Sequence, residues 1–184
     1  MRSPLVRSSA AGYSVLLLLS LGAAFWQERL GEIFGFPGWG TLATHLLIGG
    51  LMAAGVLAGS RALAGAFRWA RQLEDEFRLV LGPLTMGDIV FLAAASGFVE
   101  ELLFRAILQP ALGLWVTSIG FGLLHYPMNR RMIGWTVLAT GLGLIFGVVY
   151  LRTESLLAVA LAHGLVNLVE LRTIMRPGLN RPAD

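Results

Sequence analysis

Long stretches without a charged residue constrain this chain more than any other feature. They run over residues 8–26, 33–60, 89–99, 106–129, 132–151 and 155–169. Crossing a hydrocarbon core of about 30 Å takes about 20 helical residues, and lipid offers no partner to an unpaired backbone amide. The chain is therefore predicted to be all-α, a polytopic membrane helix bundle. The composition agrees, since 56% hydrophobic and 14% charged residues exclude an ordinary water-soluble enzyme.

We expect about six transmembrane helices in one membrane domain of residues 1–184, with a flexible tail at 176–184. The expected spans are 10–26, 41–59, 88–109, 112–126, 132–151 and 155–172. A charged amphipathic connection is expected between Arg61 and Arg78. A short basic lead and small residues near Gly22 leave a cleaved signal peptide as the alternative for the first span.

The distribution of arginine predicts the orientation of the chain in the membrane. All 14 basic residues of the chain are arginines. With the N-terminus in the cytoplasm, only Arg29 and Arg152 fall outside. The inside set is Arg2, Arg7, Arg61, Arg68, Arg71, Arg78, Arg130, Arg131, Arg172, Arg176 and Arg181. This excess favours an N-in, C-in topology. We attribute the basic charge to anionic lipid at the cytoplasmic face, and no nucleic-acid partner is expected.

The third expected span carries three ionisable groups that a bilayer disfavours, Glu100, Glu101 and Arg105. Such groups are rare inside membrane helices and usually face a cavity or a partner. Glu101 and Arg105 are four residues apart on one helix face, so we expect an ion pair that supports packing. Glu100 is rotated by about 100° from Glu101 and lacks that partner. It is therefore the candidate for chemistry.

Two further polar pairs occur at helical spacing. Phe121 and His125 end the fourth expected span, and His163 and Asn167 lie within the sixth. A single membrane histidine is more often a hydrogen-bonding group between helices than a catalytic one. Counting 1.5 Å per residue, however, puts Glu100 and these histidines at similar depth, so we expect one polar cavity. Small neighbours would allow close helix approach there, namely Gly97, Gly120, Gly122 and Gly164.

These residue types favour direct hydrolysis over covalent catalysis. The chain has no cysteine and no Gly-x-Ser-x-Gly nucleophile motif. A carboxylate that deprotonates water, with imidazole and amide groups that donate to an oxyanion, describes hydrolysis of an amide bond. No cofactor is expected. The alternative is a zinc-dependent protease in which Glu100, His125 and His163 bind the metal, although no His-Glu-x-x-His motif is present.

Three motifs in order carry a family resemblance: Glu100-Glu101-x-x-x-Arg105, Phe121-x-x-x-His125 and His163-x-x-x-Asn167. Over about residues 85–172 the chain resembles the CAAX prenyl protease 2 and bacteriocin-processing family, also called CPBP or Abi, of intramembrane glutamic endopeptidases. The resemblance implies that Glu100 activates water with His125 as its partner. It implies that His163 and Asn167 stabilise the oxyanion, and that Glu101 and Arg105 support the site.

The resemblance also implies a membrane-associated protein or peptide substrate and a location in a bacterial cytoplasmic membrane. It leaves three substrate classes open: a prenylated protein, a bacteriocin-type leader, and a C-terminal sorting segment as proposed for compact myxosortase-like members. Two other classes of function compete with a protease. A non-enzymatic immunity or scaffold protein would not need the whole motif set. A small transporter would more often show an internal repeat, and none is evident.

Overall fold

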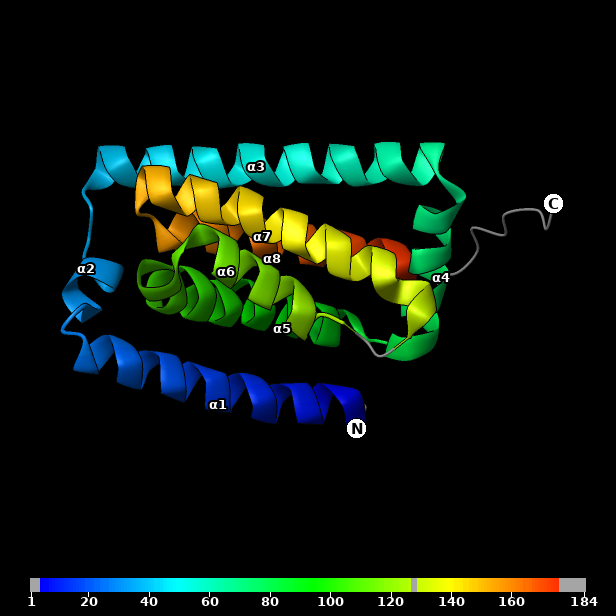
Figure 1. Ribbon diagram of the computed structural model, residues 1–184, viewed down its shortest axis with the longest axis horizontal. Helices are drawn as coiled ribbons and strands as arrows, with labels where there is room; N and C mark the ends of the chain where they lie inside the picture. Colours follow the sequence, from blue (N-terminus) through cyan, green and yellow to red (C-terminus); the bar gives the residue numbers. More distant parts are fainter. Residues whose placement is uncertain (1–3, 127–128, 176–184) are drawn as a thin grey trace.

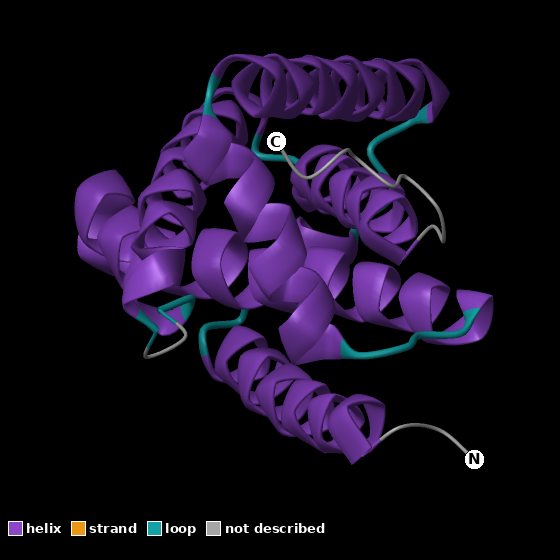
Figure 2. Ribbon diagram, turned by 90° about the vertical axis from the view of Figure 1, so that its right-hand side faces the viewer, coloured by secondary structure: helices purple, strands orange, loops and turns teal. Residues whose placement is uncertain are grey.

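A computed structural model describes residues 4–126 and 129–175, and within these ranges the chain contains helices and loops only (Figure 2). The predicted all-α membrane bundle is confirmed, while the expected flexible tail at 176–184 lies outside the described residues, as do Arg2, Arg176 and Arg181. The elements are α1 Pro4–Trp26, α2 Leu30–Phe34, α3 Trp39–Ala66, α4 Arg68–Leu81, α5 Met86–Ala95, η1 Ser96–Glu100, η2 Leu102–Leu108, α6 Gln109–Leu124, η3 Arg130–Met132, α7 Ile133–Thr153 and α8 Leu156–Met175.

Within the described residues, five helical stretches are long and apolar enough to cross a membrane, rather than the six we predicted. They are Pro4–Trp26, Trp39–Ala66, Met86–Leu124, Arg130–Thr153 and Leu156–Met175. The count differs because the spans predicted at 88–109 and 112–126 form one helical stretch of 39 residues.

That stretch is folded back on itself. Gly113 has φ 78° and ψ 166°, a conformation that interrupts the helix and favours glycine. The rings of Phe104 and Phe121 lie 5.0 Å apart. A straight helix would separate residues 17 positions apart by about 25 Å, so the chain reverses direction at Gly113. The half of α6 after the reversal is too short to cross a full hydrocarbon core.

The charged connection begins later than we predicted. α3 continues past Arg61 to Ala66, and the helix breaks at Phe67, whose backbone is extended at φ −124° and ψ 129°. The amphipathic α4 then lies across the end of the bundle (Figure 1), and its own residues Ala70 and Leu73 are buried. It covers the ends of the spanning helices at this side.

Both described ends of the chain lie at one end of the bundle. Figure 1 shows the start of α1 on the same side as α4, while α2 and the turn between α7 and α8 lie at the opposite end. The end of α8 is fixed there by Arg78, whose Nε donates to the carbonyl of Ile174 at 2.8 Å. This arrangement agrees with both termini on one side of the membrane, and the cytoplasmic assignment of that side stays a prediction.

α8 packs between α3 and the helix that bears the two glutamates, and one glycine makes the second contact possible. A Cβ atom on Gly97 would lie 2.6 Å from the amide nitrogen of Gly164, so the two backbones touch directly. A Cβ atom on Gly122 would likewise lie 2.9 Å from the carbonyl oxygen of Thr136. The expectation of close approach was wrong for Gly120, where a Cβ would meet no atom within 4 Å.

Candidate active site

The helix that bears the glutamates changes its pitch at the site. α5 begins with a capping box, in which the Thr85 hydroxyl accepts from the amide of Asp88 and the Asp88 carboxylate accepts from the amide of Thr85. From Ser96 to Leu108 the hydrogen bonding is of the π type, interrupted only at Glu101. π turns are rare and are found mostly at functional sites. The capping box fixes where the helix starts, and the π turns set where its acidic side chains point.

Glu100 is 9% exposed, and its two carboxylate oxygens have different surroundings. Oε1 accepts a hydrogen bond of 2.7 Å from the hydroxyl of Tyr13. Oε2 is buried and accepts no hydrogen bond from the protein. It lies 3.6 Å from Nε2 of His125 and 4.0 Å from Nε2 of His163. The structure thus brings three of the predicted residues, from three separate elements, to one point.

Both imidazoles are oriented by a hydrogen bond on the opposite side of the ring. Nδ1 of His125 lies 2.7 Å from the carbonyl of Phe121, and a carbonyl can only accept, so this nitrogen carries a hydrogen. Nδ1 of His163 lies 2.8 Å from Oε1 of Glu101. In each ring Nε2 is therefore the nitrogen that is directed at Glu100. Neutral imidazole would present a lone pair there, and protonated imidazole an N–H.

The expected pair of Glu101 and Arg105 is present and fully buried. Nε of Arg105 donates to Oε2 of Glu101 at 3.0 Å, while both side chains are 0% exposed. Arg105 also donates to Oε1 of Gln109 at 3.2 Å, and Gln109 donates to the carbonyl of Gly147 at 2.9 Å. Because Glu101 also holds His163, this network orients one imidazole of the site.

Asn167 lies one turn after His163 on α8, and one hydrogen of its amide group is already donated within the protein. Its Nδ2 donates to the hydroxyl of Ser96 at 2.8 Å, and Ser96 donates to the carbonyl of Leu92 at 2.7 Å. An amide nitrogen carries two hydrogens. One hydrogen holds Asn167 in place, and the other can be donated to a bound group.

Three residues of this site were not predicted from the sequence: Tyr13, Ser96 and Gln109. Each had a local signal. Tyr13 is the one tyrosine in the first charge-free stretch, and Ser96 is one turn before Glu100. Gln109 follows Arg105 by four residues, which places it on the same helix face. Their partners lie 87, 71 and 38 residues away in the sequence, a separation that no local pattern reveals.

Within residues 4–126 and 129–175, no group of three or more His, Asp or Glu side chains has a geometry that could hold a metal ion. The carboxylate and imidazoles at Glu100 are nevertheless the donor types that zinc uses. The zinc alternative therefore concerns the same three side chains and needs a direct test.

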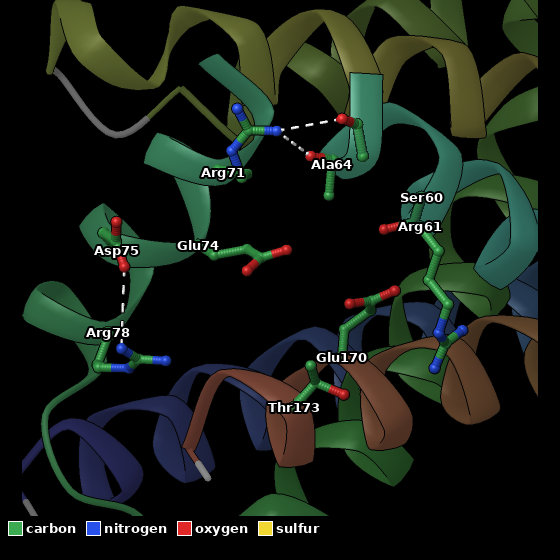
Figure 3. A pocket seen from close by; sticks show the side chains of 10 residues that line it. Ser60, Arg61, Ala64, Arg71, Glu74, Asp75, Arg78, Glu170 and Thr173 are labelled. Atoms are coloured by element: carbon green, nitrogen blue, oxygen red, sulfur yellow. Dashed lines mark hydrogen bonds and ion pairs between the residues drawn. The ribbon is translucent and has the colours of Figure 1, made fainter. Parts of the chain in front are cut away.

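The site opens into an apolar cavity of about 450 Å³ that Glu100, His125, His163 and Asn167 help to line. A second, more polar cavity of about 690 Å³ lies under α4, at the ends of α3 and α8 (Figure 3). The two cavities share four lining residues, Ser60, Ala64, Glu74 and Glu170. The two cavities are therefore adjacent, and the polar one lies at the charged end of the bundle.

Arginines of α4 fix the walls of the polar cavity. Arg71 donates to the carbonyl of Ala64 at 2.6 Å, near the end of α3, and Arg78 caps α8 as described above. Figure 3 shows the carboxylates of Glu74 and Glu170 directed into the space between these helices. The charged α4 thus lines a polar cavity next to an apolar one.

Comparison with known proteins gives a partial match. Residues 82–169 match the family described as type II CAAX prenyl endopeptidase, Rce1-like. The chain is also 34% identical over 83 residues to the protein YpbD of Bacillus subtilis (strain 168). That alignment covers 44% of this chain and 42% of YpbD, so the chain spans less than half of this relative. No solved structure matches the chain.

Proposed function

We propose that this chain is an intramembrane endopeptidase, because residues 82–169 match the Rce1-like family of type II CAAX prenyl endopeptidases, a family of membrane proteases. We propose that it uses Glu100 to activate the water that attacks a peptide bond. One observation carries the proposal: the buried Oε2 of Glu100, which has no protein partner, faces Nε2 of His125 at 3.6 Å and Nε2 of His163 at 4.0 Å.

These separations are too long for direct hydrogen bonds and suit a water molecule bridging the carboxylate to an imidazole. Glu100 accepts one proton of that water while the water oxygen attacks the peptide carbonyl carbon. His125 orients the water through Nε2, because its Nδ1 hydrogen is already donated to Phe121. The proton held by Glu100 then passes to the amine as the C–N bond breaks, and a carboxylic acid and an amine are formed.

The oxyanion that forms in the attack requires hydrogen-bond donors. The free N–H of Asn167 supplies one, since the other is donated to Ser96. His163 supplies a second through Nε2 when it is protonated on both nitrogens. In that form Nδ1 donates to Oε1 of Glu101, 2.8 Å away, and the N–H on Nε2 is left for the oxyanion. Arg105 in turn holds Glu101, so these two residues position His163 without reaching the substrate.

We further propose that the reaction needs no metal or other cofactor. Dialysis of the purified enzyme against a strong chelator is expected to leave the cleavage rate unchanged. Loss of activity that returns on addition of Zn²⁺ would contradict this expectation and favour the zinc alternative. The same treatment of a known zinc protease provides the positive control.

We propose a membrane-associated protein or peptide as the substrate and a bacterial cytoplasmic membrane as the location. Apolar segments of such a substrate suit the cavity next to Glu100, and charged segments suit the polar cavity beneath α4. We propose no nucleic-acid partner, and anionic lipid contacts the arginine-rich face of the bundle.

The decisive experiment compares the membrane proteomes of cells that express the wild type, Glu100→Gln or no protein. New N-termini and C-termini are mapped by mass spectrometry in each. Cleavages made by the wild type are expected to disappear in Glu100→Gln, because an amide cannot accept the proton of water. Glu154→Gln is the matched control, since it makes the same change at an exposed carboxylate directly after α7.

Equal accumulation of the variants in the membrane must be shown by immunoblot. Full proteolysis by Glu100→Gln would remove the hydrolase assignment from this site. Cells in which wild type and Glu100→Gln give identical termini and identical bacteriocin tolerance would instead point to a non-enzymatic scaffold or immunity role.

A further inference from the structure

Helix α1 lies outside the family match, yet it contributes a hydrogen bond to the candidate general base. Most of α1 is exposed within the described structure, with only Val6, Ser20 and Ala24 buried. The hydroxyls of Ser14 and Ser20 donate to carbonyls of α1 itself, one turn earlier. Tyr13 differs from these serines, since its hydroxyl donates across to Oε1 of Glu100 at 2.7 Å. A side chain of α1 therefore enters the site.

A second contact holds α1 against the same π-helical stretch. Just after α1 ends, Arg29 donates from Nη1 to the carbonyl of Ala106 in η2, and it pairs with Glu32 at 2.6 Å. α1 is thus attached just beyond its C-terminal end by Arg29 and near its middle by Tyr13. This two-point attachment holds the tyrosine hydroxyl at a defined place relative to Glu100.

The hydrogen bond to Oε1 decides where the other oxygen of Glu100 points. The last torsion of a glutamate side chain is broad, so a carboxylate held by nothing samples many orientations. Fixing Oε1 against Tyr13 leaves Oε2 directed at His125 and His163, where the proposed water binds. A donated O–H also stabilises the charged carboxylate, the form that accepts a proton from water.

The tyrosine also lies close to the other half of the site. Tyr13 and Ser96 line the same cavity, and Ser96 accepts the hydrogen bond from Asn167. The single hydroxyl hydrogen of Tyr13 is donated to Glu100, so Tyr13 acts on the proposed base and not on Asn167. Removing the tyrosine hydroxyl leaves both proposed catalytic groups in place.

We propose that Tyr13 is a positioning residue for Glu100, supplied by α1 to a site that otherwise lies in the family-matched segment and the helices packed on it. The inference rests on the proposed function. Tyr13 acts through Glu100: it orients the carboxylate and favours its charged form, and it does not itself exchange a proton with substrate or water.

The test is Tyr13→Phe, which deletes one oxygen and keeps the ring. A fluorogenic peptide built on a cleavage site mapped in the proteome comparison serves as the probe. We expect kcat to fall by about 10-fold to 100-fold, the range for losing a hydrogen bond to a charged group, with KM unchanged. Among the described residues, the titratable groups that face Glu100 are Tyr13 from α1, His125 directly after α6 and His163 from α8.

Because the carboxylate loses a donor, the acidic limb of the pH profile of kcat/KM is expected to move to higher pH. A purely structural role for Tyr13 would lower the amount of folded enzyme and leave the pH profile in place. Ser14→Ala is the matched control, since it removes an exposed hydroxyl from the neighbouring position of the same helix. It is expected to behave as the wild type.

The outcomes separate this inference from the proposed function. Wild-type kcat and pH profile in Tyr13→Phe, with Glu100→Gln inactive, would overturn the role of Tyr13 alone. Activity in Glu100→Gln would overturn the proposed function itself.

A cross-linking experiment tests the geometry without relying on activity. The natural chain has no cysteine, so the double variant Tyr13→Cys, Ser96→Cys has a single thiol pair. A short bifunctional reagent is expected to join α1 to η1 in membranes. Failure to cross-link, or removal of α1 from the mature protein by a signal peptidase, would also overturn the inference.

Discussion

The contact between Gly97 and Gly164 makes a demanding prediction about the geometry of the site. In Gly97→Ala the new Cβ would lie 2.6 Å from the amide nitrogen and 2.7 Å from Cα of Gly164, and 3.0 Å from the carbonyl of Ala160. All three are backbone atoms, so no side chain can rotate away. Restoring an ordinary separation of 3.4 Å requires the two helices to move apart by about 0.8 Å.

This displacement acts directly on the site, because His163 precedes Gly164 and Glu100 follows Gly97 by three residues. A misplacement of about 1 Å can lower a rate about 100-fold, and we expect a loss of turnover of that order. Overpacking costs about 1–3 kcal/mol, partly offset by about 0.5–1 kcal/mol that alanine gains over glycine in a helix. The net loss of stability is therefore about 0–2.5 kcal/mol, whereas a 100-fold loss of rate corresponds to about 2.7 kcal/mol.

Cleavage of the fluorogenic peptide in nanodiscs measures the first quantity, and thermal unfolding in mild detergent measures the second. Two glycines provide matched controls. A Cβ on Gly164 would lie 3.4 Å from the carbonyl of Ala93, and one on Gly120 would meet no atom within 4 Å. Gly164→Ala and Gly120→Ala are expected to stay within about threefold of wild-type activity. A Gly97→Ala enzyme that cleaves as fast as these controls would refute the reasoning.

Further predictions concern the side chains of the site. Glu101→Gln breaks a fully buried ion pair with Arg105, so the free energy of unfolding should fall by about 3–5 kcal/mol, measured by thermal unfolding. Glu32→Gln removes an exposed partner of Arg29 and should cost less than about 1 kcal/mol; equal losses would show that burial does not govern the Glu101 pair. Asn167→Ala, which removes a proposed oxyanion donor, should lower kcat by about 100-fold or more in the peptide assay. An unchanged rate would exclude that role.

Local spacing predicts those parts of the molecule that depend on neighbours along one helix. The charge-free stretches locate the helices, and the four-residue spacing of Glu101 and Arg105 predicts their ion pair, which the structure contains. Depth counting along separate helices suggests that Glu100 and the two histidines meet, and the structure brings them together. These features follow from helix geometry alone.

Features that depend on the packing of distant segments are not visible in the pattern. The π turns between Ser96 and Leu108 could not be predicted, because the composition of this stretch is that of an ordinary apolar span. The reversal occurs at Gly113, four residues beyond the predicted end of the third span. Its position could not be predicted, because only the folded chain shows which glycine takes a positive φ. Tyr13 could not be assigned, since its partner lies 87 residues away and hydroxyls elsewhere on α1 bond within their own helix.

The reversal at Gly113 has a consequence for the order in which the protein is assembled during synthesis. Glu100, Glu101 and His125 all lie on the single helical hairpin of residues 86–124 and the residue that caps it, so they come together as soon as that hairpin forms. His163 and Asn167 belong to α8, which is synthesised after that hairpin. A nascent chain therefore has Glu100, Glu101 and His125 in place before His163 and Asn167 have been added. If the proposed function is correct, hydrolysis therefore begins only after α8 has packed against the hairpin.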